Sequence, residues 1–157
     1  MSGADIERAL LDAAQLEPKQ DVLVLGSGAL ALAAHERVSD GWVYVVQSQV
    51  DELEELLGEA HAAGASGVAY LVGEAPVLPL PDDAVVAAVG RIATDEGALG
   101  AAAEELARVL SAGGRASFAE PDMRAGDELA RALAAAGFEQ VQVVDVGEQA
   151  VVSAWLA

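Results

Sequence analysis

Short apolar runs alternate along the chain with longer segments whose apolar residues recur at helical spacing. The runs are rich in valine, which is typical of strands buried on both faces of a parallel sheet. The longer segments carry apolar residues three and four positions apart, which predicts amphipathic helices. The predicted strands are 22–25, 42–46, 68–72, 84–89, 115–119, 141–146 and 151–156, and the predicted helices are 2–16, 29–37, 50–59, 95–110 and 127–136.

This order of elements predicts an α/β architecture. Strands that alternate with helices pair in parallel and place the helices on both faces of the sheet, whereas the last two predicted strands follow each other directly and form a hairpin. We therefore expect a mostly parallel seven-stranded sheet with strand 22–25 at its centre and an antiparallel C-terminal hairpin. The length of 157 residues predicts a single domain, 1–157, with an N-terminal helix or lid in 1–20 and a core in 21–157.

Three segments are predicted to interrupt regular structure. The stretch 76–83 holds three prolines and is predicted to be a loop. Residues 111–114, Ser-Ala-Gly-Gly, are interpreted as a glycine signal that ends the preceding helix. Residues 120–122, Glu-Pro-Asp, are expected to end the fifth strand, and Glu120 and Asp122 there either orient a substrate amine or stand in a solvated loop.

The most informative stretch is DVLVLGSGALALAA, residues 21–34. Its apolar run ends in a turn at Gly26 and Gly28 and continues directly into an alanine- and leucine-rich helix. A helix start presents free backbone N–H groups, and the helix dipole there favours anions or polar ligand groups. Glycines let the chain turn sharply and let a ligand lie against bare backbone. The stretch predicts the first βα unit of a nucleotide-type binding domain.

The charge of the chain limits its partners. The sequence has 26 acidic and 8 basic residues, for a formal net charge of −18. Such a charge repels phosphate backbones and anionic membranes, so we expect neither nucleic-acid nor membrane binding. We interpret the charge as an aid to solubility or to life in a salty cytoplasm, with a specific basic partner as the alternative.

Other features predict a cytoplasmic protein without a metal site. The sequence has no cysteine, which excludes disulfides and thiolate metal sites. Its two histidines, His35 and His61, lie in predicted helices without metal-ligand spacing. There is no basic-then-apolar leader and no apolar run of about 18 residues. A homo-oligomer and a monomer both stay open.

Several stretches together resemble class I S-adenosylmethionine-dependent methyltransferases of the broad type 11 group. They are VLVLGSGALALA (22–33), VGEAPVLPLPDDAVVAAV (72–89), ELARVLSAGGRASFAEP (105–121) and LAAAGFEQVQVV (133–144). The resemblance extends from about Asp21 to Ala157. It implies a Rossmann-like class I methyltransferase fold, which is a three-layer αβα sandwich, with S-adenosylmethionine as cofactor and a small-molecule acceptor of the methyl group.

The resemblance also implies where the cofactor binds. Gly26 and Gly28 would approach its methionine part, Gln47 its ribose, and Glu74 with Ala75 its adenine, while Arg91 would face donor and acceptor. These residues lie at the carboxyl ends of the predicted parallel strands, where open α/β sheets bind ligands. No catalytic side chain is assigned, because methyl transfer can proceed by positioning a nucleophile against the sulfonium. The full predicted cofactor set is Gly26, Ser27, Gly28, Gln47, Ser48, Gly73, Glu74, Ala75, Gly90 and Arg91.

Departures from the family pattern keep two other functions open. Gln47 stands where the family usually has an acidic residue, and GSGAL replaces the usual GCGTG. A neutral amide accepts a hydrogen bond without the strength that a charge adds. The first alternative is a non-catalytic methyltransferase-like module for binding or assembly. The second is a nicotinamide-nucleotide-binding domain, because Gly26, Gly28 and Ala31 also satisfy G-x-G-x-x-A.

Overall fold

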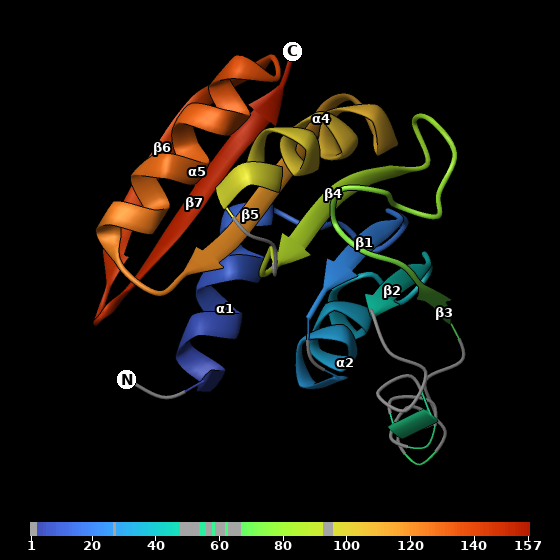
Figure 1. Ribbon diagram of the computed structural model, residues 1–157. Coiled ribbons are helices and arrows are strands. Elements are labelled where there is room, and N and C mark those ends of the chain that lie inside the picture. Colours follow the sequence, from blue (N-terminus) through green and yellow to red (C-terminus); the bar gives the residue numbers. More distant parts are fainter. Residues whose placement is uncertain are drawn as a thin grey trace.

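A computed structural model of the chain describes residues 3–26, 28–47, 54–55, 58, 62, 67–92 and 96–157. These residues form one mostly parallel sheet with helices on both faces (Figure 1). The strands are β1 (Val22–Leu25), β2 (Val43–Gln47), β3 (Val68–Val72), β4 (Val85–Gly90), β5 (Leu110–Glu120), β6 (Phe138–Val146) and β7 (Gln149–Leu156). The helices are α1 (Gly3–Ala14), α2 (Gly28–Arg37), α4 (Leu99–Val109) and α5 (Met123–Ala135), and η1 (Glu96–Ala98) is a short 3-10 helix.

The sheet has the strand order β3-β2-β1-β4-β5-β7-β6. Neighbouring strands from β3 to β5 pair in parallel, and β7 pairs antiparallel with both β5 and β6. This confirms the α/β fold with seven strands and an antiparallel C-terminal hairpin. Strand β1 lies inside the sheet between β2 and β4, although β4 takes the middle place that we predicted for β1.

Alternating side chains of β1 explain the three layers. Val22 and Val24 pack on the face covered by α1 and α2, and Leu23 and Leu25 pack on the face covered by α4 and α5 (Figure 1). Each of these four side chains is at most 5% exposed. Burial of a valine or leucine stabilises a fold by about 1.5–3 kcal/mol, so β1 anchors both layers.

The helical spacing of Ile6, Ala9, Leu10 and Ala13 predicts the buried face of helix α1, and the structure shows a partly different apolar stripe. Ile6 and Leu10 are buried as expected, and Leu11 and Ala14 are buried with them. Ala9, which the helical spacing placed on the buried face, is only partly buried. The N-terminal segment is therefore a packing helix over β4, β5 and β7.

The structure corrects the expected boundary between α4 and β5. Residues 111–114 do not simply end the helix, because β5 already begins at Leu110, which is fully buried and pairs with Val85. The register then shifts, so that Ala87 pairs with Arg115 and the residues between form a bulge. The Ser111 hydroxyl donates to the Val85 carbonyl at 3.3 Å, which ties this bulge to β4. A buried leucine at position 110 thus decides where the strand begins.

Helix α5 begins earlier than residue 127, where we predicted it. The Asp122 side chain accepts a hydrogen bond from the Ala125 amide at 2.8 Å and caps a helix that starts at Met123. An aspartate cap of this kind stabilises a helix by about 1 kcal/mol. Asp122 is exposed, as expected of a solvated residue, and the cap is a role that the sequence analysis did not assign to it; the orientation of a substrate amine stays a prediction.

One expectation concerns a part of the chain that the structure describes little. The helix predicted for 50–59 lies largely outside the described residues, of which Glu54, Glu55 and Gly58 are helical. Within the described ranges, no helix is long and apolar enough to span a membrane.

Candidate functional site

The carboxyl ends of β1, β2, β3 and β4 are tied together by hydrogen bonds. The Arg91 amide donates to the Leu25 carbonyl at 2.7 Å, which joins β4 to β1. The Gly73 amide donates to the Gln47 carbonyl at 2.9 Å, which joins β3 to β2. The Gln47 side-chain amide donates to the Gly26 carbonyl, which joins β2 to the turn after β1. Four strand ends therefore form one fixed rim.

A cleft of about 300 Å³ opens at this rim. Every lining residue belongs to a strand end or to the turn that follows it, as expected for the ligand edge of an open α/β sheet. The cleft is lined by Leu25, Gly26, Val46, Gln47, Gly73, Glu74, Ala75 and Arg91.

The cleft brings together six of the ten residues predicted to bind the cofactor, and the other four lie elsewhere or are not described. Gly28 is the first residue of α2, and its surroundings are not described. Gly90 lines a neighbouring cavity. Ser27 and Ser48 lie outside the described residues. The six in the cleft are Gly26, Gln47, Gly73, Glu74, Ala75 and Arg91.

The neighbouring cavity, of about 210 Å³, lies between the same rim and α1. It shares Leu25, Gly26 and Arg91 with the cleft and adds Ile6, Glu7 and Leu10 of α1, together with Leu30 and Gly90. These α1 residues were not predicted from the sequence. Helical spacing indicated that α1 would pack, but not which of its turns would reach the strand ends.

Residue 90 must be glycine because the backbone of β1 lies very close to it. Its φ is +133°, and a Cβ at this position would lie 1.9 Å from the Leu25 carbonyl oxygen. Only glycine lets β4 turn at its end this close to β1. The strand pairing alone therefore requires glycine here, and the contact of Gly90 with a cofactor stays a prediction.

Gln47 faces the rim with a defined orientation. Its Nε2 must point toward Gly26, because a carbonyl oxygen can only accept a hydrogen bond. The amide oxygen Oε1 is then the acceptor that this side chain can offer to a ligand in the cleft. This geometry matches a neutral hydrogen bond to a ligand hydroxyl.

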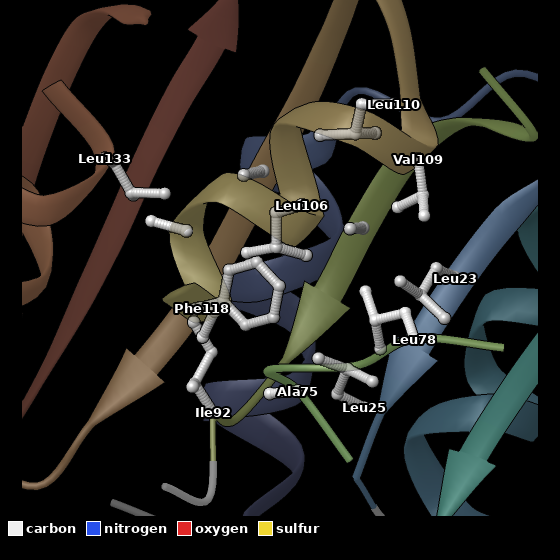
Figure 2. Close-up of a cluster of buried hydrophobic side chains, with 14 of the residues drawn as sticks. Leu23, Leu25, Ala75, Leu78, Ile92, Leu106, Val109, Leu110, Phe118 and Leu133 are labelled. Carbon is white, nitrogen blue, oxygen red and sulfur yellow. The ribbon is translucent and has the colours of Figure 1, made fainter. Parts of the chain in front are cut away.

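The proline-rich loop holds the Glu74 side of the cleft against the core. Ala75 and Leu78 are 7% and 4% exposed and belong to the same apolar cluster as Leu23 and Leu25. Figure 2 shows Ala75 and Leu78 on the loop beside these leucines. A Cβ on Gly73 would lie 2.7 Å from Pro79 Cδ, so the loop packs back onto the strand end. Glu74 itself is exposed at the rim.

Arg91 also borders a third cavity, on the hairpin side. This cavity of about 540 Å³ is lined by Arg91, Pro121 and residues 146–149 of the β6–β7 turn. Arg91 Nη2 donates to Gln149 Oε1, which fixes the guanidinium between the cleft and the hairpin. Arg91 is thus a wall shared by all three cavities.

Glu120, at the carboxyl end of β5, is the acidic group with the most perturbed ionisation near this edge. Burial raises the pKa of the Glu120 carboxyl to about 7, and the charges of Asp122 and Glu128 add to the rise. The positive charge of Arg91 opposes it. Glu120 can therefore hold or release a proton near neutral pH.

The described part of the chain contains no cluster of side chains that could hold a metal ion. No group of three or more histidine, aspartate or glutamate side chains there is arranged to hold an ion.

No protein-family model and no curated protein matches the sequence, but solved structures match the fold. A SAM-dependent methyltransferase from Aquifex aeolicus has a TM-score of 0.81 over 98% of this chain and 90% of its own, at 22% identity. A geranyl diphosphate C-methyltransferase from Streptomyces coelicolor A3(2), solved with S-adenosyl-L-homocysteine, has a TM-score of 0.82 over 98% and 76%, at 16% identity. The [4+2]-cyclase SpnF has a TM-score of 0.80 over 98% and 80%, at 17% identity.

These similarities concern the fold. Both methyltransferases match nearly the whole chain, from α1 to the C-terminal hairpin, whereas the match with a cyclase is equally good. The assignment to type 11 stays a prediction, since no family model matches. The chain has the Rossmann-like fold of the class I S-adenosylmethionine-dependent methyltransferases.

Proposed function

We propose that this chain binds S-adenosylmethionine in the cleft at the ends of β1 to β4 and transfers its methyl group to a small-molecule acceptor. The observation that carries the proposal is the composition of that cleft. Gly26, Gln47, Glu74 and Ala75 come from three different strand ends, and they line one cavity with Arg91 of a fourth. The resemblance in sequence implied these five residues together with Gly28.

The residues of the cleft fit the parts of the cofactor. Gly26 leaves backbone free of side chain where the methionine part would lie. Gln47 Oε1 can accept a hydrogen bond from a ribose hydroxyl, because its Nε2 is already bonded to Gly26. Ala75 and the exposed Glu74 form the wall for the adenine. The cleft of about 300 Å³, extended by the adjoining cavity of about 210 Å³, falls in the usual size range of ligand sites, roughly 300–1,000 Å³.

The chemistry that this chain must supply is positioning. When bound, S-adenosylmethionine supplies a methyl group on a positively charged sulfur. Arg91 separates the cleft from the cavity beside the β6–β7 turn, so we place the acceptor in that cavity. An acceptor nucleophile there forms its bond to the methyl carbon as the carbon–sulfur bond breaks, and the electron pair of that bond passes to sulfur. Alignment of reacting atoms alone can lower a barrier by about 7–11 kcal/mol.

The net charge of −18 favours this cofactor over its product. Transfer converts a sulfonium into a neutral thioether, so the ligand loses one positive charge in a negative field. Because salt screens such fields, with a Debye length of about 10 Å at 0.1 M and about 3 Å at 1 M, we expect added salt to weaken binding of S-adenosylmethionine more than binding of S-adenosylhomocysteine.

Calorimetric titration with S-adenosylmethionine, S-adenosylhomocysteine and NAD tests the proposal. The first two should bind, and NAD should not. Gln47→Met should weaken binding, because methionine keeps the length of the side chain and loses its amide. The matched control is Gln142→Met on β6, which lies outside the cleft wall and should bind like the parent. Absence of binding by the parent would refute the proposal.

A non-catalytic binding or assembly module is the second candidate, and one observation favours it. Residue 47 is a neutral glutamine already engaged with Gly26, where methyltransferases of this type usually have an acidic residue. A methyl-transfer assay with labelled S-adenosylmethionine and a panel of small amines, phenols and carboxylic acids separates the two. Cofactor binding with no transfer across the panel favours the module, and binding of NAD alone favours the nicotinamide-nucleotide domain.

A further inference from the structure

We propose that Glu105 and Arg108 of α4 are positioning residues that hold the Glu74–Ala75 wall of the cleft through the proline-rich loop. The inference rests on the proposed function, since it concerns how well that wall receives a ligand. Neither side chain lines the cleft. Both act on it through the backbone of Leu78.

Both backbone groups of Leu78 are held by α4. The Leu78 amide donates to Glu105 Oε2 at 2.8 Å, and Arg108 Nη2 donates to the Leu78 carbonyl at 3.1 Å. The two side chains are also bonded to each other, from Arg108 Nε to Glu105 Oε1 at 2.7 Å and from Nη2 to Oε2 at 2.9 Å. This two-pronged pairing fixes the orientation of both groups.

Arg108 also holds the far end of the loop. Its Nη1 donates to Asp82 Oδ1 at 2.9 Å, and its own carbonyl accepts from the Asp83 amide at 3.0 Å. One residue of α4 therefore contacts the middle and the end of the segment that connects β3 to β4. A loop attached at both places has few conformations left.

A short and rigid segment connects Leu78 to the cleft. The Val77 amide donates to the Glu74 carbonyl at 2.9 Å, closing a tight turn around Ala75. Pro79, the next residue after Leu78, packs on Gly73 at the end of β3. Ala75 and Leu78 both point into the apolar cluster below the sheet edge (Figure 2). A shift of Leu78 would therefore move the wall that Glu74 and Ala75 form.

Glu105 keeps its charge in this place. The hydrogen bond from Arg108 lowers the pKa of the Glu105 carboxyl, against the opposing effect of its burial. Its side chain is only 20% exposed, so water replaces its contacts poorly. The substitution Glu105→Gln keeps the size of the side chain. Glutamine has only one acceptor oxygen, so it cannot accept the hydrogen bonds of Leu78 and Arg108 on two oxygens as the carboxylate does.

The test compares affinity with stability. We would titrate S-adenosylhomocysteine into the parent, Glu105→Gln, Arg108→Lys and Asp122→Ala, and record the melting temperature of each. Asp122→Ala removes the cap of α5, away from the loop, and serves as the control that lowers stability alone. We expect Glu105→Gln and Arg108→Lys to weaken binding at least fivefold, and Asp122→Ala to bind like the parent at a lowered melting temperature.

A double-mutant cycle adds a measurement that a purely structural role would leave unchanged. If Glu105 acts through the Glu74 wall, the effects of Glu105→Gln and Glu74→Ala on the dissociation constant should be less than additive. Unchanged affinity in both α4 variants, or full additivity, overturns the inference while the parent still binds. Absence of binding by the parent instead refutes the proposed function. If Glu105→Gln fails to fold, Arg108→Lys, which keeps the positive charge, decides the question.

Discussion

The substitution Gln47→Glu separates the two roles of Gln47, which are to tie β2 to the glycine turn and to offer an oxygen to the ligand. In the parent, Nε2 donates to the Gly26 carbonyl. A glutamate has the same length and no N–H, so this hydrogen bond is lost. Its second oxygen carries negative charge toward the position that we assign to the ribose.

The two changes have opposite expected effects, because one lowers stability and the other raises affinity. Loss of a neutral hydrogen bond lowers the free energy of unfolding by about 1 kcal/mol, which is a fall in Tm of about 2–4 °C for a domain of this size. Net hydrogen bonds to charged groups contribute about 1.5–3 kcal/mol, against about 0.5–1.5 kcal/mol for neutral ones. The gain in binding is therefore about 1.4 kcal/mol, or roughly tenfold. Stability should fall while affinity rises.

Thermal melts and titrations with S-adenosylhomocysteine on the parent, Gln47→Glu and Gln47→Met measure both effects. The methionine variant loses the bond to Gly26 as well, so its Tm should fall by the same amount, but its affinity should fall too. Gln47→Asp is one methylene shorter and should gain less affinity than Gln47→Glu. If Gln47→Glu binds no better than Gln47→Met, residue 47 does not face the ligand and the reasoning is refuted.

Three further predictions concern stability. Because a charge of −18 repels itself, the Tm should rise along a potassium chloride series from 0.1 to about 1 M, and a flat or falling series would reject this. The pKa of Glu120 is raised to about 7, so the folded state holds this proton more tightly than the unfolded state and loses stability as pH rises from about 4.5 to about 7. The fall in Tm between pH 5 and pH 8 should be smaller in Glu120→Gln than in the parent, and equal falls would contradict the assignment. Asp122→Ala should cost about 1 kcal/mol by calorimetry, and an unchanged Tm would show that the cap is not needed.

Much of the fold could be predicted because strand burial leaves a direct mark on the sequence. Val22–Leu25 and Val68–Val72 are both apolar runs with clear breakers on either side, and both strands have the predicted bounds. The hairpin was readable from two consecutive strands around Gly147. Helix α2 begins at Gly28, one residue before the expected start, because the glycine turn marks its position closely.

The boundaries that failed depend on tertiary contacts. Residues 110–114 look like the end of a helix in sequence, because glycines commonly follow helices. In the structure Leu110 is drawn into the core and pairs with Val85, so the strand begins there and the glycines form a bulge. The start of α5 depended on one capping contact of Asp122 that the apolar pattern did not register.

The candidate site was predictable where it follows from topology. Parallel strands end at one edge, so Gly26, Gln47, Glu74 and Arg91 had to come close once the sheet was assigned. The α1 wall of the second cavity and the attachment of the loop to Glu105 and Arg108 could not be predicted in this way. Both depend on how helices far apart in sequence from the strand ends dock on the sheet.

The distribution of charge at this edge suits the proposed ligand, whose amino-acid part is zwitterionic and whose sulfur carries a positive charge. Each of the three cavities there contains Arg91 and one glutamate, which is Glu74 in the cleft, Glu7 beside α1 and Glu148 at the hairpin. A carboxylate on the ligand can pair with the guanidinium, while its cationic groups lie in the negative field of the rest of the chain. The loss of the usual acidic residue is thus consistent with a cofactor site in a chain of this charge, because attraction to the sulfonium then comes from the net charge of the chain and no longer depends on one side chain.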